Sequence, residues 1–303
     1  NFEVGSPLLL TRPDAPFSIR GNLDSGASRL TVGGEARDAL ALDGLDLEAV
    51  LESPDPAPLL ALLGRAVPVG QAPPLNARAR LTSENATFAV RELSVDWGAS
   101  HVDGELSYAM AAPRPRLEGR LHASLIDLIV LGPLIEAETP SQAEPTAPRL
   151  TPGPLTTHDG SLVLAVDRIR LPATEISDVA LTVRLQDGQL IADPLRLTLP
   201  QGSVTGWLGF DDLDAGSFAG EIQLSANAID LAGIAPAAGI AGSLSADLRG
   251  RLAGADLAGL LTQSELRLTG HAEELAVPQF GTAPSSLAFA ATTAGSGEQP
   301  IEI

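Results

Sequence analysis

The sequence predicts an all-β fold, an extended and strongly curved antiparallel β-sheet with the form of a groove and with a few short helices. Three observations predict it: short runs in which apolar and polar residues alternate, turn residues between those runs, and the lack of any long helical run. Alternation with a period of two gives a strand one apolar face and one polar face. Because the runs recur at variable spacing, they favour one long curved sheet over a propeller or a solenoid with a fixed period.

The first part of the chain, residues 1–135, is expected to form a first β module with short helices. Residues 29–32 are strand-like and are followed by Gly33 and Gly34, which predict a turn. Residues 56–64 have the proline entry, apolar run and glycine exit of a short helix. Further strands are predicted within residues 75–125, for example where Leu75, Ala77, Ala79 and Leu81 alternate with Asn76, Arg78 and Arg80.

Residues 136–157 differ in composition, because prolines stand among Ser, Thr, Glu and Ala with hardly any bulky apolar residue. This composition predicts a linker or a mobile loop. Residues 158–303 are expected to form a second β module that continues the same sheet. Within it, Asp187-Gly188 predicts a two-residue hairpin turn, since both central positions need φ above zero.

One stretch, Phe218 to Ile234, shows the repeating pattern at full length. A strand with Ile222 and Leu224 on its apolar face leads into Ile229-Asp230-Leu231, where Asp230 is expected to cap a short helix. Similar Asp-Leu steps stand at residues 44–50 and 125–131, with a weaker one at residues 255–261. The order strand, strand, strand, short helix is therefore predicted to recur.

Composition and charge exclude several classes of function. The chain has 303 residues, a formal net charge of -19, no cysteine and only 3% aromatic residues. Such an acidic surface repels phosphate backbones, so nucleic acid is excluded as a partner. The absence of cysteine excludes disulfides, zinc-thiolate sites and thiol nucleophiles. All basic residues are Arg, which fits biased codon usage better than bidentate anion contacts.

The sequence also argues against an enzyme, a metal site or a bound cofactor. The four histidines are far apart, and His101 and His271 each have one nearby acid, which is too few ligands for a metal. No nucleophile elbow or phosphate loop is present. Paired acids such as Glu273-Glu274 point to opposite faces of a strand and lack the aromatic lining of a sugar cleft.

Two segments and the order of their motifs resemble the AsmA family. Runs that start at glycine and end in Ile-Asp-Leu occur at Gly119 to Leu128 and at Gly220 to Leu231, and the proline-rich break lies between them. The family's segment of the form G-x-s-x-v-x-G-x-l is matched by Gly98, Ser100, Val102, Gly104 and Leu106. The order Asp187-Gly188-Gln189-Leu190, then Gly202-x-Val204-x-Gly206, also follows the family, and the resemblance covers most of the chain.

The resemblance implies a place in the envelope of Gram-negative bacteria, with the body of the protein in the periplasm and an N-terminal helix anchoring it in the inner membrane. Members similar to the TamB and YhdP proteins are thought to carry phospholipids along an apolar groove made by a curved sheet. The present sequence shows no run long enough to span a membrane, and both its ends have the pattern of interrupted strands, so we expect a piece of a longer protein.

The apolar faces of the predicted strands form the candidate site. Residues expected to line one side of the sheet and to bind a phospholipid or another acyl-chain ligand are Leu181, Val183, Leu185, Leu195, Leu197, Leu199, Ile222 and Leu224. This side must be covered by something. Two readings stay open: an open trough supporting phospholipid transport or outer-membrane homeostasis, and a closed dry core in an envelope scaffold that acts through contacts with other envelope proteins.

Overall fold

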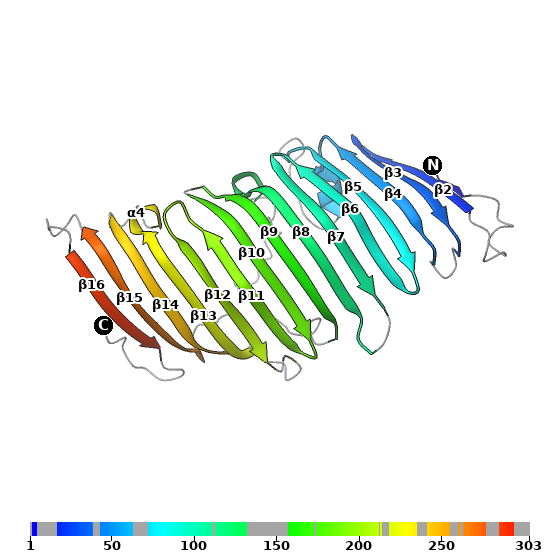
Figure 1. Cartoon of the computed structure of the whole chain (residues 1–303). Helices are drawn as coiled ribbons and strands as arrows, with labels where there is room; N and C mark the ends of the chain where they lie inside the picture. Colours follow the sequence, from blue (N-terminus) through cyan, green and yellow to red (C-terminus); the bar gives the residue numbers. More distant parts are fainter. Residues whose placement is uncertain are drawn as a thin grey trace, which may run out of the picture. The chain divides into compact units, whose positions relative to one another are not determined.

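Antiparallel β-strands that follow one another in sequence order account for nearly all of the structure that is described. The structure is a computed structural model that describes residues 2–4, 17–38, 43–62, 72–110, 113–131, 157–172, 174–211, 213, 218–234, 241–254, 260, 263–276 and 285–293. Unit 1 comprises residues 1–142 and unit 2 comprises residues 143–303. In each unit every strand pairs with the strands next to it in sequence, and Figure 1 shows the strands side by side and bowed along their length.

Unit 1 contains strands β1 to β8 in sequence order and the short helix α1. Their bounds are β1 Phe2–Val4, β2 Phe17–Ser25, β3 Ser28–Ala36, β4 Asp46–Ser53, α1 Ala57–Leu62, β5 Leu75–Glu84, β6 Thr87–Trp97, β7 Ser100–Ala109 and β8 Arg116–Asp127. The helix predicted at residues 56–64 is thus confirmed as α1, and Asp55 Oδ1 accepts a hydrogen bond from the Ala57 N–H at 3.1 Å to cap it.

Unit 2 contains strands β9 to β16 in sequence order and the short helix α4. Their bounds are β9 Asp159–Arg170, β10 Glu175–Gln186, β11 Gln189–Thr198, β12 Ser203–Asp211, β13 Phe218–Asp230, α4 Leu231–Ile234, β14 Ala241–Gly254, β15 Glu265–Ala276 and β16 Ser285–Thr293. The prediction of an all-β antiparallel fold with a few short helices is confirmed. The predicted linker at residues 136–157 lies outside the described residues except for Thr157, and its role stays a prediction.

Local turn and cap predictions can be compared with the structure one by one. The hairpin at Asp187-Gly188 is confirmed, with φ of 51° and 77° at the two positions. The cap at Asp230 is also confirmed, because its Oδ1 accepts a hydrogen bond from the Ala232 N–H at 3.0 Å at the start of α4. The step at residues 44–50 is different: Asp46 is the first residue of β4 and opens no helix. The step at residues 255–261 lies almost wholly outside the described residues.

Bulges interrupt several strands at a point where the apolar spacing changes from two residues to three. In β6 the apolar face passes from Val90 to Leu93, and Glu92 between them has φ of 51°. The same three-residue step, with a non-glycine residue of positive φ inside it, occurs at Asp178 in β10, Ala228 in β13 and Glu274 in β15. Each bulge absorbs the extra residue and returns the apolar side chains to their original face.

Glycines on the apolar face allow neighbouring strands to approach closely. A Cβ atom on Gly206 would collide with the carbonyl oxygen of Gln223 in β13, and one on Gly104 would collide with the carbonyl oxygen of Arg120 in β8. Both glycines lie on the apolar face by register, opposite Leu224 and Leu121. Missing side chains on one face, together with bulges, are the two devices that bend a β-sheet toward that face. They account for the bowed strands.

The two faces of each sheet differ sharply in chemistry. In unit 1 one face carries Leu30, Leu51, Ala77 and Val95, each directly opposite the next across β3, β4, β5 and β6. The other face is charged, and cross-strand ion pairs connect its strands. The shortest is a bidentate pair in which Arg80 Nε and Nη2 donate to Asp46 Oδ1 and Oδ2 at 2.7 and 2.6 Å. This hydrogen-bonded pairing lowers the pKa of the Asp46 carboxyl below its usual value.

We expect Gly206→Ala to lower the free energy of unfolding by about 1–3 kcal/mol, because the new methyl group must displace backbone of β13. Gly209→Ala is the matched control in the same strand, since its nearest neighbours are the movable Trp207 ring at 3.3 Å and a carbonyl oxygen at 3.7 Å. This control should leave stability unchanged or raise it slightly. Urea titration followed by circular dichroism measures both. Equal stabilities of the two variants would show that β12 and β13 do not approach in this way.

We expect Asp46→Asn to weaken the acid sensitivity of the protein. A carboxyl whose pKa is lowered in the folded state stabilises the fold above its unfolded pKa and loses that contribution as the pH falls below about 4. The urea midpoint of Asp46→Asn should therefore drop less than that of the wild type between about pH 5 and about pH 3. The effect is small because the Asp46 side chain is 49% exposed.

Glu52→Gln in the same strand is the control, because among the described residues the Glu52 carboxylate accepts no hydrogen bond. An identical loss of stability on acidification in wild type and Asp46→Asn would contradict the assignment.

Candidate functional site: an apolar sheet face

The structure brings the predicted site residues to one face of unit 2. Cross-strand register places Leu181 opposite Leu195, and Gly206 links Leu195 to Leu224 across β12. Val183 lies two residues along from Leu181 on the same face, and Ile222 lies two residues along from Leu224. Leu185 and Leu197 complete the set, whereas Leu199 follows the last residue of β11. The register thus groups seven of the eight predicted residues on one face, and their binding of lipid stays a prediction.

This face is larger than the sequence prediction assigned. We call it the apolar face of unit 2, and it also contains Leu162, Leu164, Val166, Val179, Leu190, Ala192, Val204, Leu208, Phe210, Phe218, Ala226, Ile229, Leu244, Leu248, Leu252, Leu266, Leu268, Ala272, Leu287 and Phe289. The signal for these residues was the same alternation that identified the others. Extending the alternation through every strand would have found them.

Most of these side chains are neither buried nor fully exposed. Leu181, Leu195 and Leu224 are all half-buried, which is the exposure expected when neighbours on one sheet shield each other and no second layer covers them. Leu287 in the last strand is 51% exposed. The apolar face of unit 2 therefore presents aliphatic surface across its strands.

The ends of the strands are more deeply buried than the middle of the face. At one end Leu213 is fully buried and Phe218 is 6% exposed, and the Phe218 ring packs edge-on against Phe210 with centroids 5.4 Å apart. At the opposite end Ile229 is 3% exposed and precedes α4, which packs on β14. The more accessible aliphatic side chains of this face thus lie between buried strand ends.

Unit 1 carries an equivalent surface, which the sequence prediction of site residues missed. The apolar face of unit 1 consists of Phe17, Ile19, Leu23, Leu30, Val32, Ala36, Leu47, Ala49, Leu51, Leu75, Ala77, Ala79, Leu81, Phe88, Val90, Leu93, Val95, Trp97, Val102, Leu106, Tyr108, Leu117, Leu121 and Ala123. Leu23 and Leu117 at its outer strands are 54% and 46% exposed. Both units therefore offer the same kind of surface.

No second sheet covers either apolar face within the described residues of its unit. Each strand packs mainly on the strands next to it, and among the described helices α4 packs on β14. In a β-sandwich, strands distant in sequence would face each other about 10 Å apart. The described part of each unit thus has the single layer that an open trough requires.

The charged face has hollows of another kind. Two hollows in unit 1, of about 370 and 700 Å³, are both lined by Asp46, Arg80 and Glu92. A third in unit 2, of about 380 Å³, is lined largely by small polar side chains such as Ser225, Ser245 and Thr269. Charged and hydroxyl-bearing walls do not suit an acyl chain. The opposite face, with its aliphatic side chains, has the chemistry that suits an apolar ligand.

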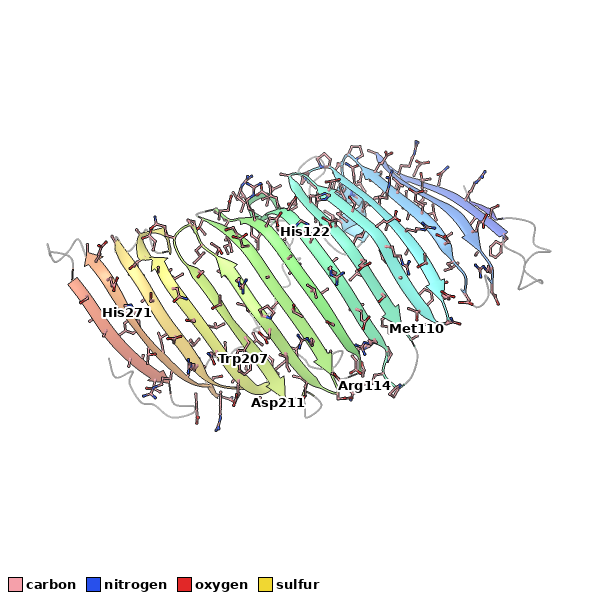
Figure 2. The ribbon with its side chains drawn as sticks, in the orientation of Figure 1. Met110, Arg114, His122, Trp207, Asp211 and His271 are labelled. Atoms are coloured by element: carbon pink, nitrogen blue, oxygen red, sulfur yellow. The ribbon has the colours of Figure 1, made fainter. Side chains whose placement is uncertain are left out.

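The histidines of unit 1 lie on the charged face. His101 Nδ1 is 2.7 Å from Asp96 Oδ1, and His122 Nδ1 is 3.0 Å from Asp103 Oδ1. Figure 2 shows His122 together with Trp207 and His271 among the side chains of the two units. In the part of the chain that the structure describes, no group of three His, Asp or Glu side chains is arranged to hold a metal ion.

None of the described helices has the length and apolar character needed to cross a bilayer.

Comparison with known proteins identifies a similar bacterial protein of the AsmA family. Over 228 residues the chain is 25% identical to AsmA family protein YhjG of Escherichia coli strain K12, and the aligned region is 67% of this chain and 33% of that protein. The chain thus aligns with about a third of the length of this relative. The match confirms the resemblance to the AsmA family. No protein-family model and no solved structure matches the chain.

Proposed function

We propose, from this similarity to the AsmA family, that the chain has a non-catalytic function in the Gram-negative cell envelope, where it supports phospholipid transport or outer-membrane homeostasis. Its apolar faces would hold acyl chains while headgroups stay in water. As the family resemblance implies, the body of the protein would lie in the periplasm and the full-length protein would be anchored at the inner membrane. The similarity itself favours an envelope function, and the lipid-binding role rests on the sheet.

The observation that supports lipid binding is the continuous half-exposed aliphatic face. One row crosses unit 2 from strand to strand and is interrupted only by Gly206; its residues are Leu164, Leu181, Leu195, Leu224, Leu248 and Leu268. Soluble proteins rarely leave so large a contiguous apolar surface exposed unless it contacts a partner, a ligand or a membrane. An aliphatic lining without polar groups suits saturated acyl chains, which make no hydrogen bonds.

The energetics are consistent with movement of a lipid along the face without nucleotide hydrolysis. Each methylene exposed to water costs about 0.8 kcal/mol, so carrying an acyl chain of about sixteen carbons through water would cost on the order of 12 kcal/mol. On the apolar face every row offers similar aliphatic contacts. A chain can therefore move from row to row without crossing a barrier of that size, and no nucleotide site is required.

Site-specific photo-crosslinking provides the test. A photoreactive amino acid is placed in turn at Ile222, Gln223, Leu224 and Ser225, which alternate between the apolar and the charged face of β13. The variants are expressed in a Gram-negative host and analysed for phospholipid adducts. We expect adducts at Ile222 and Leu224 and none at Gln223 and Ser225. Adducts at all positions, or at none, would overturn the proposal.

A charge on the apolar face gives an independent measurement. Val183→Asp puts a carboxylate opposite Leu162 and Ala192, whereas Thr182→Asp puts one on the other face of the same strand. We expect Val183→Asp to lose co-purified lipid, measured by native mass spectrometry, and Thr182→Asp to keep it. Each variant is checked for folding by circular dichroism. Equal lipid content in two folded variants would contradict the site.

The alternative is an envelope scaffold that acts through protein contacts. It is favoured if the wild-type protein carries no lipid and if the crosslinker at Ile222 and Leu224 captures protein segments instead. Such a result would mean that another polypeptide covers the face.

A further inference from the structure

Two arginines lie directly opposite each other on the charged face of unit 2. Arg249 in β14 pairs with Arg267 in β15, and both side chains are exposed. On the other side of β14, Arg249 lies opposite the neutral Gln223. Like charges directly opposite each other destabilise a β-sheet. Neither guanidinium forms an ion pair with an acid among the described residues, so the described part of the fold leaves this repulsion uncompensated.

Unit 1 contains an opposed pair of the same kind, and there carboxylates compensate the charge. Arg80 in β5 lies opposite Arg91 in β6. Asp46 accepts two hydrogen bonds from Arg80, and Glu92 Oε1 is 4.0 Å from Arg80 Nη1. The hydrogen bonds from Arg80, together with the charge of Arg91, lower the pKa of the Asp46 carboxyl. The pair in unit 2 lacks such carboxylates among the described residues and is open to an anion from solution.

A polar hollow begins one row away from the arginines of unit 2. Asp247 and Thr269 lie opposite each other in the next row of the same face, and both line a hollow of about 380 Å³. Ser225, Asn227 and Ser245 also line it. This volume falls within the range of about 300–1,000 Å³ that is typical of ligand pockets. Hydroxyl, amide and carboxylate groups suit the hydroxyls of a saccharide, which donate and accept hydrogen bonds.

We propose that this surface binds a phosphorylated saccharide, with the phosphate held between Arg249 and Arg267 and the sugar ring in the adjoining hollow. Arginine binds phosphate oxygens bidentately, and the bound phosphate offsets the repulsion within the pair. Asp247 is placed one row away to accept a hydrogen bond from a sugar hydroxyl. The net charge of -19 still disfavours a polyanion, whereas a single phosphate responds mainly to charges within the screening distance of about 8 Å.

This site goes beyond the proposed lipid function and does not depend on it. Arg249 and Arg267 alternate with Leu248 and Leu268, so they point away from the apolar face of unit 2. An acyl chain on the apolar face therefore does not reach the arginines. The two sites can be tested separately, and failure of one leaves the other unaffected.

Ligand-observed NMR on the whole chain, in low-salt buffer without phosphate, tests the site. The probes are glucose 1-phosphate, glucose 6-phosphate and glucosamine 6-phosphate, with unphosphorylated glucose for comparison. We expect at least one sugar phosphate to bind the wild type and glucose to bind much more weakly. Failure of all three sugar phosphates to bind, or equal binding of glucose, would overturn the proposal.

Substitution of the arginines has a matched control in the same strand. Arg251 points to the same face as Arg249, but it lies directly opposite Glu221 and Glu265. We expect Arg249→Gln and Arg267→Gln each to weaken sugar phosphate binding about tenfold, the effect of losing a hydrogen bond to a charged group. Arg251→Gln should bind as the wild type does. Equal weakening in all three variants would reveal a general effect of charge and would rule out the site.

Thr269→Val examines the saccharide part, because it removes a hydroxyl group and keeps the shape of the side chain. We expect it to weaken sugar phosphate binding about three- to tenfold. Binding of inorganic phosphate, followed by phosphorus NMR, should stay unchanged. Full sugar phosphate binding by this variant would contradict the place assigned to the sugar ring.

The phosphorylated sugar can be free in solution or can be the headgroup of a glycolipid, and cosedimentation separates the two sources. Phosphatidylcholine vesicles with and without a glycolipid that bears a phosphorylated sugar are compared. Extra cosedimentation that depends on the glycolipid and is lost in Arg249→Gln assigns the headgroup. Sugar phosphate binding in solution without such cosedimentation assigns a soluble ligand. Extra cosedimentation that Arg249→Gln retains would contradict the role of the arginines.

Urea titration without ligand checks the charge argument and the folding of the variants. Arg249→Gln removes a like-charge contact, so its urea midpoint should equal or slightly exceed that of the wild type. Arg251→Gln removes a charge that lies between two acids, so its midpoint should be slightly lower. A lowered midpoint for Arg249→Gln would mean that its guanidinium has an acidic partner, and the premise of an uncompensated pair would then be wrong.

Discussion

Direct cross-strand pairing is the constraint on which the rest of the structure depends. In an antiparallel ladder, residues that face each other across two strands point to the same side of the sheet. The alternation of apolar and polar residues must therefore stay in register through every strand of a unit. A slip of one residue anywhere would turn an entire strand's apolar set into the charged face. The row from Leu30 through Leu51 and Ala77 to Val95 shows that the alternation stays in register from strand to strand. Separation of the chain into an aliphatic side and a charged side follows from it.

Bulges and glycines keep the apolar side chains on one face while the sheet bends. At Glu92 and Asp178 the chain takes a left-handed residue that is not glycine, and the apolar side chains on either side return to one face. At Gly104 and Gly206 the lack of a side chain lets the next strand come close on the apolar side. Curvature is thus concentrated on the side that carries the aliphatic groups, which brings these groups closer together than a flat sheet would.

Much of this could be predicted from the sequence, because alternation and turn chemistry are local signals. The hairpin at Asp187-Gly188, the cap at Asp230 and the helix now called α1 were all predictable in that way. The step at Asp46 differs because Asp followed by Leu fits both a helix cap and a strand edge, and pairing of β4 with β3 and β5, where Asp46 lies opposite Glu35 and Thr82, decides between them. The turn at Asn85-Ala86 lacks glycine although both residues have positive φ, of 50° and 59°, so no turn signal revealed it.

Other features depend on distances that no local pattern contains. The three-residue steps at the bulges were visible in the spacing of Val90 and Leu93, yet only the register shows that they return to one face. The unpartnered indole N–H of Trp97 is another feature that local patterns do not contain. Its sequence context is that of an ordinary strand end, and no local pattern reveals that its buried indole N–H has no hydrogen-bond partner among the described residues.

The strict order of the strands has a consequence for how such a sheet gains and loses structure. Within each unit a strand depends on the strand before it and the strand after it, so its stability is close to a sum of nearest-neighbour terms, as in repeat proteins. Folding can begin at any hairpin and spread strand by strand, and loss of structure can begin at the outer strands while the centre persists. Such a sheet can lengthen or shorten by whole hairpins during evolution without redesign of a common core.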